Sequence, residues 1–224
     1  MVMELLHGRT LAERIALPPR LPVEEAIRIA LLTLRGLAKV HEAGIVHRDL
    51  KPANIFLVED ADGAFPKILD FGISRSVDPN SGRKSALTTS DGLIVGTPEY
   101  MSPEQARGLR DLDLRTDLYS IGVILYECLT GKRPYESEHT GDLIIMVVNG
   151  GAPPVIELRP DVSQALSDVI AKAMSRKREQ RFQDVRAMQR ALEAAAESSL
   201  DEGIRRTRSM MPPAASESAG LEYE

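Results

Sequence analysis

The sequence predicts an α+β domain that is mainly α, in which a few short strands carry functional loops. Three observations lead to this class. Apolar residues recur at helical spacing before residue 42 and again after residue 115, short β-prone runs lie between residues 45 and 69, and a polar stretch at 74–91 separates the two parts. The 224 residues are 43% hydrophobic and 27% charged, a composition that allows a globular domain with a sizeable core.

Charge and cysteine content narrow the classes of partner. The 28 basic and 33 acidic residues give a net charge of -5, so no basic surface for nucleic acid or an anionic membrane is expected. The longest apolar run, residues 121–129, is too short to span a bilayer, and no secretory signal precedes it. The single cysteine, Cys128, lies inside that run and indicates a core position in a protein of the reducing cytoplasm.

The first half of the chain begins with a helix and continues with short strands. A helix is expected over 22–41, with Pro22 at its start, Gly44 just past its end and apolar residues at spacings of three and four. The runs 45–46, 55–58 and 67–69 are rich in β-prone residues and are separated by turn residues such as Asp62 and Gly63. Loops between short strands are common places for functional residues.

The second half is expected to be helical. The polar stretch 74–91 is longer than most connections and predicts a functional loop. Helices are expected at about 115–130, 141–149, 163–175 and 183–197, and the first of these is apolar on nearly every side, which indicates a buried helix. Residues 198–224 have no hydrophobic period and predict a disordered tail or linker.

Three motifs in order carry the chemistry. His47-Arg-Asp-Leu-Lys-Pro-Ala-Asn54 is followed by Asp70-Phe-Gly72 and then by Gly96-Thr-Pro-Glu-Tyr-Met-Ser-Pro-Glu104. Each is weak alone, but the series resembles the eukaryotic-like serine/threonine protein kinases, most closely their bacterial members, over about residues 1–197. The resemblance implies the fold of a kinase large lobe, whose short strands bear the catalytic and metal loops.

Phosphoryl transfer needs an oriented hydroxyl, a divalent metal and positive charge near the phosphate oxygens. The resemblance implies that Asp49 orients the hydroxyl of a protein serine or threonine and accepts its proton. Asn54 and Asp70 are implied as Mg²⁺ ligands for ATP, and both offer the oxygen donors that magnesium prefers. Lys51, two residues after Asp49, points the same way in an extended loop and can steady the transferred phosphate.

The resemblance also assigns supporting and regulatory residues. His47 and Phe71 are implied to pack with Asp117 as the internal support of the catalytic loop. Arg48 and Arg75 are implied to bind a phosphate on the loop between the second and third motifs, and a phosphate there can order that loop. The acceptors expected for this phosphate are Thr88 or Thr89, whereas the alternative is a solvated polar loop without such a role.

The third motif is implied to form the substrate segment. Thr97 and Pro98 match the part that contacts the acceptor side of the substrate, and together with Lys51 they favour serine/threonine over tyrosine as acceptor. Glu104 and Arg181 match a buried ion pair that ties this segment to the late helices.

The opening residues are implied to form part of the nucleotide site. Glu4 and Leu6, which follow an apolar residue at position 3, match the hinge whose backbone holds the adenine edge. Phe56 matches the floor beneath the adenine.

Two parts of a complete kinase site are missing from the sequence. No Gly-x-Gly occurs, and nothing before the catalytic motif resembles Val-Ala-Ile-Lys. The same absence argues against dinucleotide-binding and P-loop proteins. A zinc-protease site fails on spacing, because His47 follows His41 by six positions instead of four.

Two functions therefore remain open. In the first, residues 1–197 are the hinge and large lobe of an active kinase, whose small lobe lies outside this sequence or on another chain, and an activating kinase is a further possible partner. In the second, the chain is a non-catalytic, kinase-like binding or regulatory module, since a site open to water lacks the positioning that catalysis needs.

Overall fold

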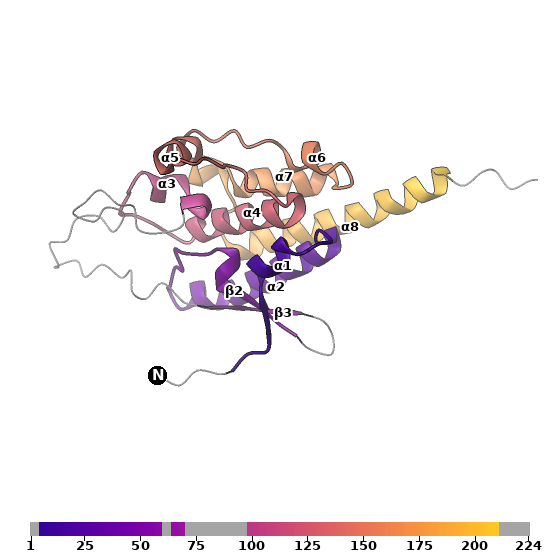
Figure 1. Cartoon of the computed structure of the whole chain (residues 1–224), viewed down its shortest axis with the longest axis horizontal. Helices are drawn as coiled ribbons and strands as arrows, with labels where there is room; N and C mark the ends of the chain where they lie inside the picture. The colour runs from indigo at the N-terminus through magenta and orange to yellow at the C-terminus, as the bar shows by residue number, and fades with distance from the viewer. Residues whose placement is uncertain (1–4, 60–63, 70–97, 211–224) are drawn as a thin grey trace, which may run out of the picture.

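Helices make up most of the described chain, which confirms the predicted α+β, mainly α class. The computed structural model describes residues 5–59, 64–69 and 98–210. The body is formed by four helices that pack on one another (Figure 1): α2 (Val23–Glu42), α4 (Arg115–Thr130), α7 (Gln164–Ala173) and α8 (Val185–Met210). Shorter helices surround them: α1 (Leu11–Ala16), α3 (Pro103–Ala106), α5 (Thr140–Asn149) and α6 (Val155–Leu158).

A three-stranded antiparallel sheet lies against α2. Its order is β1 (Gly8–Thr10), β2 (Ile55–Val58) and β3 (Phe65–Ile68), with Ile55 opposite Ile68 and Phe56 opposite Thr10. The sequence predicted β2 at its observed position. It predicted the start of β3 two residues too late, and it did not predict β1. The prediction of a strand at 45–46 is wrong, because the Ile45 N–H donates to the carbonyl of Val40 at 3.1 Å and so closes the end of α2.

Helix α4 occupies the centre of the core. Leu118, Leu125 and Leu129 are at most 1% exposed, so the expectation of a buried helix is confirmed. Gly122 allows close packing, since a Cβ atom at this position would lie only 2.9 Å from the Cβ of Ala173 in α7. The depth of α4 fixes the polar side chains of its first turns in a place that water does not reach.

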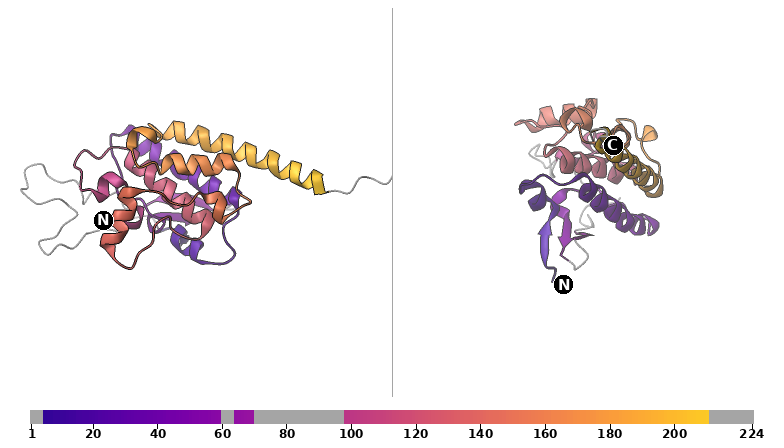
Figure 2. Two further views of the ribbon diagram at one scale, coloured as in Figure 1. Left: turned by 90° about the horizontal axis from the view of Figure 1, so that it is seen from above. Right: turned by 90° about the vertical axis from the view of Figure 1, so that its right-hand side faces the viewer.

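Helix α8 continues beyond the end at residue 197 that the sequence predicted. Figure 2 shows its last turns running past the body of the molecule. Residues 198–210, expected to be disordered, are therefore helical, while 211–224 lie outside the described residues. In the sequence, Asp201 and Glu202 precede Arg205 and Arg206 by four positions, a spacing that supports a helix without any apolar period.

No helix in the described ranges is both long enough and apolar enough to cross a membrane.

Candidate active site

The segment 47–54 lies between α2 and β2 in the chain and contacts the first turn of α4. Its backbone is held by the carboxylate of Asp117, which is fully buried. The N–H groups of His47 and Arg48 donate to the two oxygens of Asp117 at 2.9 and 2.8 Å. A buried carboxylate requires such donors, so the sequence places an acid here to fix a loop. The expected support of His47 by Asp117 is thus present, while Phe71 lies outside the described residues.

A histidine that sequence reasoning missed completes this support. Nε2 of His41, in the last turn of α2, lies 2.8 Å from Oδ2 of Asp117, and the His41 side chain is 7% exposed. Because a carboxylate accepts hydrogen bonds, Nε2 carries the proton of this contact. No motif in the sequence singles out His41, because a partner 76 positions away leaves no local pattern.

The backbone conformation of Arg48 directs the side chains of His47 and Asp49 to opposite sides of the loop. Its φ of 64° lies in the left-handed region, which is uncommon for any residue but glycine. Two hydrogen bonds hold it there: the N–H of Arg48 donates to Asp117, and its carbonyl accepts from Nε2 of Gln105 at 2.7 Å. This turn lets His47 point inward and Asp49 point outward.

The contacts of His47 assign its tautomer. The N–H of Asp49 donates to Nδ1 of His47 at 3.3 Å, and Nε2 of His47 lies 3.1 Å from the carbonyl of Leu69. Since a carbonyl only accepts, Nε2 carries the proton. The buried imidazole therefore links the loop to the chain that follows β3.

The three predicted catalytic residues of the loop lie together. Nζ of Lys51 is 3.4 Å from Oδ2 of Asp49, and both side chains are about one-quarter exposed, at 23% and 26%. Nδ2 of Asn54 donates to the carbonyl of Asp49 at 2.9 Å, and the Asn54 N–H donates to the carbonyl of Lys51 at 2.9 Å. The short 3₁₀ helix η1 (Pro52–Asn54) that they close gives the loop a fixed shape.

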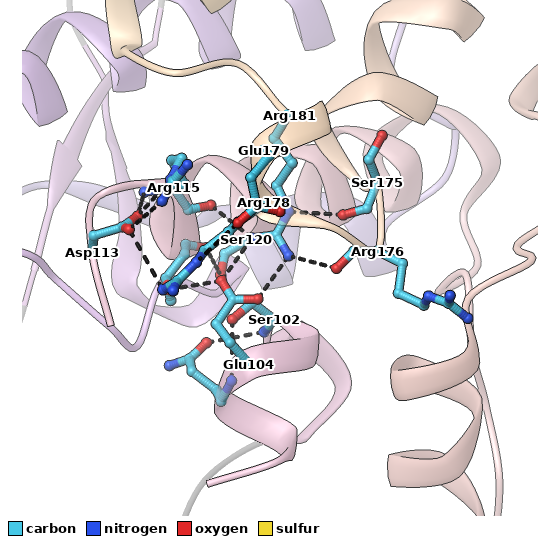
Figure 3. A network of polar contacts seen from close by, with 12 residues as sticks. Ser102, Glu104, Asp113, Arg115, Ser120, Ser175, Arg176, Arg178, Glu179 and Arg181 are labelled. Carbon is cyan, nitrogen blue, oxygen red and sulfur yellow. Dashed lines mark hydrogen bonds and ion pairs between the residues drawn. The ribbon is translucent and has the colours of Figure 1, made fainter. Parts of the chain in front are cut away.

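An ion pair buried in the core ties the third motif to the segment between α7 and α8 (Figure 3). Arg181 donates to both oxygens of Glu104 at 2.7 Å, and its side chain is fully buried. Arg181 also donates to the carbonyls of Ser175 and Arg176, which follow α7. Thr116 donates to Glu104 at 3.0 Å. The predicted pairing of Glu104 with Arg181 is confirmed.

The ion pair decides the charge of Glu104. Burial raises the pKa of this carboxyl, but the hydrogen bonds and the positive charge of Arg181 more than offset burial, so the pKa lies below its usual value. Ser102 caps α3 beside it through a capping box with Gln105, which fixes where Glu104 enters the core.

A buried acid holds the loop, Asp49 and Lys51 are partly exposed on it, and the buried Asn54 ties its backbone together. The sequence model of the protein kinase domain covers residues 1–193. The chain belongs to the protein kinase family. The family's reaction uses ATP and Mg²⁺.

Curated relatives and solved structures agree with this assignment. The chain is 38% identical over 209 residues to the serine/threonine-protein kinase Pkn1 of Myxococcus xanthus, covering 93% of this chain and 29% of Pkn1. It is 36% identical over 197 residues to PknL of Mycobacterium tuberculosis, covering 88% of this chain and 47% of PknL. A crystal structure of a double mutant of the Mycobacterium tuberculosis PknI kinase domain superposes with a TM-score of 0.65 at 25% identity, covering 87% of this chain and 65% of that one. The kinase chain thus spans less than half the length of either curated relative.

The magnesium ligands predicted for this kinase are described only in part. Asn54 uses its amide nitrogen on Asp49, and its carbonyl oxygen is of the type that magnesium prefers. Asp70 follows Leu69, whose N–H donates to the carbonyl of Asn54 at 2.8 Å, but Asp70 itself lies outside the described residues. Within the described ranges no group of three His, Cys, Asp or Glu residues could hold a metal, so the ligand pair stays a prediction.

One of the three residues predicted to contact the nucleotide, Phe56, lies in the sheet. Leu6 precedes β1 and Phe56 lies in β2, and both are half-buried. Gly8 lies close to the backbone of β2, since a Cβ atom at this position would clash with the carbonyl oxygen of Leu57 and would lie 3.2 Å from Cε1 of Phe56. Glu4 lies outside the described residues. The adenine role of all three stays a prediction.

The residues predicted for regulation and for substrate contact are also described only in part. Arg48 is described, and its Nε is buried without a hydrogen-bond partner in the part of the chain that the structure covers. Pro98 begins the 3₁₀ helix η3 (Pro98–Tyr100), which is anchored because Ser120 of α4 donates to the carbonyl of Tyr100 at 2.9 Å. The other predicted residues of these two groups lie outside the described ranges: Arg75, Thr88, Thr89 and Thr97.

Proposed function

We propose that this chain carries the phosphoryl-transfer loop of a serine/threonine protein kinase that moves the γ-phosphoryl group of ATP to protein hydroxyls. The observation that carries the proposal is the convergence of Asp49, Lys51 and Asn54 on one loop whose backbone Asp117 holds. The printed names of Pkn1 and PknL support serine and threonine as acceptors.

Each residue has one part in the proposed reaction. Asp49 orients the acceptor hydroxyl and takes its proton, because its carboxylate is partly exposed on the outer side of the loop. Lys51, at 3.4 Å from that carboxylate, brings positive charge to the side where phosphate oxygens gather. Asn54 and Asp70 would hold Mg²⁺, which would neutralise charge on the nucleotide when it is bound.

The roof of the nucleotide site is proposed to come from outside this sequence. The 224 residues contain neither a glycine-rich loop nor the strand lysine that pairs with a helix glutamate. We therefore propose residues 1–197 as hinge and large lobe, with Leu6, Phe56 and Glu4 beneath a small lobe that another segment supplies.

Phosphorylation of the loop between residues 74 and 91 is proposed as the regulation of this site. The buried Nε of Arg48 has no partner among the described residues and lies on the catalytic loop itself. A phosphate on Thr88 or Thr89 would supply a charged acceptor for Arg48 and Arg75. Phosphopeptide mass spectrometry after incubation with an active kinase tests this, and unmodified peptides throughout would contradict it.

A second candidate is a kinase-like module that binds without catalysis. The missing glycine-rich loop favours it, because a phosphate site open to water lacks positioning. The cytoplasmic location inferred from the single cysteine is part of both proposals.

One assay distinguishes the two candidates. Transfer of labelled phosphate from ATP to a generic basic protein is measured for the chain and for its Asp49→Asn and Asp70→Ala variants. Asp168→Asn, an exposed change on α7, is the control. Activity that survives in the control and vanishes in both site variants supports the kinase. Equal signal in all four proteins indicates contamination and contradicts the kinase proposal for this chain.

Nucleotide binding is measured separately from turnover. If the chain binds ATP and Mg²⁺, its melting temperature rises with their concentration, and Asn54→Ala removes the magnesium-dependent part. Binding with no transfer in any protein favours the non-catalytic module.

A further inference from the structure

An apolar groove follows the N-terminal half of α2, on the side where α8 leaves the body. It has a volume of about 300 Å³, and Ala196 of α8 forms one wall. A second groove of about 490 Å³ shares Leu32 and Arg35 with it and continues to Phe65 in β3, which is 48% exposed. We call the first of these the α2 groove, lined by Val23, Glu24, Ile27, Arg28, Leu31, Leu32, Arg35 and Ala196.

The rim of the α2 groove is positively charged. Arg28 and Arg35 are separated by seven residues, which is two helical turns, and so they lie on the same face of α2. Both are exposed, and neither pairs with an acid in the described ranges. Glu24 is the one acidic residue of the lining, so two positive charges stand against one negative charge.

A segment of the same chain has the complementary chemistry. Residues 211–224 contain three glutamates and no lysine or arginine. Within them, Leu221-Glu222-Tyr223-Glu224 alternates large apolar residues with acids. In an extended chain such alternation places Leu221 and Tyr223 on one face and both carboxylates on the other.

The length of chain allows this segment to reach the groove. Helix α8 advances about 21 Å between Ala196 and Met210, at about 1.5 Å per residue. The residues from 211 to 221 can span up to about 36 Å at about 3.3 Å each. Figure 1 shows the end of α8 on the same side of the molecule as the start of α2. The segment can therefore return over α2.

We propose that the α2 groove binds residues 221–224 of its own chain. Leu221 and Tyr223 cover the apolar floor. Glu222 and Glu224 face the rim that Arg28 and Arg35 form. The surface is then an intramolecular docking site, at the end of α2 opposite to the catalytic loop.

Disulfide trapping tests the proposal on the full chain. Gly220→Cys is combined with Glu24→Cys in the groove or, as the control, with Glu179→Cys, an exposed acid near the start of α8. The start of α8 lies at the other end of α2, since Arg186 pairs with Glu42 there. The native Cys128 is left in place, because it is buried and burial raises its pKa, so little reactive thiolate forms.

The groove pair is expected to form its disulfide at least about tenfold faster than the control pair, in a product that stays monomeric; this ratio corresponds to about 1.4 kcal/mol. Adding Leu221→Ser and Tyr223→Ser is expected to lower the rate to that of the control. Equal rates for the two pairs would overturn the proposal. A disulfide-linked dimer as the main product would also overturn it, because the occupant would then be a second copy.

Discussion

Nε2 of His41 lies 2.8 Å from the carboxylate of Asp117, the same group that accepts the backbone N–H of His47 and of Arg48. Three donors from two separate segments thus converge on one buried acid at the start of α4. Aspartate is needed because each oxygen can accept from a different direction without carrying a proton itself. The position of the loop at 47–54 consequently depends on a residue about 70 positions further along the chain.

Removing this acid should destabilise the kinase chain strongly. Asp117→Ala leaves the N–H groups of His47 and Arg48 buried without acceptors, which costs about 2 to 5 kcal/mol. Urea unfolding followed by circular dichroism measures the change. Asp168→Ala on the exposed face of α7 serves as the control and should change the stability by less than about 0.5 kcal/mol. Equal midpoints for the two variants would show that the loop is held by other contacts.

His41 should show a graded response to substitution. His41→Phe keeps most of the volume but removes the donor to Asp117, with an expected loss of about 1 to 3 kcal/mol. His41→Gln retains an N–H donor and should lose less. The comparison is made by thermal melting at one pH. If both variants melt at the wild-type temperature, the contact adds nothing to stability.

Removing one partner of the Glu104–Arg181 ion pair should destabilise the folded chain strongly. Glu104→Ala strands the buried guanidinium of Arg181, which costs about 3 to 5 kcal/mol. The double variant Glu104→Leu with Arg181→Met should regain much of the lost stability, since no unpaired charge then remains. A double variant as unstable as Glu104→Ala would mean that the cavity, and not the charge, causes the damage.

The same pair predicts how stability depends on pH. The folded-state pKa of Glu104 lies below its usual value of 4.5, so folding favours the ionised carboxylate. The stabilisation is fully present above the usual pKa and is lost as the pH falls through the lowered one. The gap in melting temperature between wild type and Glu104→Gln should therefore shrink in acid. A gap that stays constant down to the lowest pH at which the chain folds would contradict this.

Arg48 offers a test of backbone strain. At its φ of 64°, glycine is relaxed whereas alanine is not. Arg48→Gly should therefore be more stable than Arg48→Ala by about 1 kcal/mol, the reverse of the usual order of these two residues. Chemical unfolding of the two variants measures the difference. Alanine equal to or better than glycine would show that the loop relaxes.

Gly122 tests the close packing of α4 on α7. Gly122→Ala forces the new methyl group against Ala173 and should destabilise the chain by about 1 to 3 kcal/mol. The matched control is Gly141→Ala in α5, where nothing lies within 4 Å of the added atom, and which should be neutral or slightly stabilising. The same effect at both positions would exclude packing as the cause.

The sequence predicted the large helices well because their pattern is local. The expected ranges 22–41 and 115–130 differ from α2 and α4 by at most one residue at either end. Apolar spacing and flanking Pro and Gly carry this information within a short window. The predicted helix at 183–197 ends before α8 does, because beyond residue 197 the helical signal lies in charge spacing and not in apolar residues.

The strands and the support of the site were harder to predict. The strand β1 has three residues and exists through its pairing with β2, almost 50 positions away. His41 is the corresponding case in the site, because its partner Asp117 belongs to another helix. The ion pair of Glu104 and Arg181 was predicted by resemblance alone. Contacts between distant segments have no periodic signature in one sequence.

The first turns of α4 connect three functional segments at once. Asp117 holds the loop at 47–54, Thr116 contacts Glu104 of the third motif, and Ser120 holds the carbonyl of Tyr100. Opening of this one helix end would release all three segments together, so they form a single cooperative unit in the sense of native-state hydrogen exchange. The amides of these segments should accordingly exchange with one shared opening free energy, and a ligand that protects one of them should protect the other two.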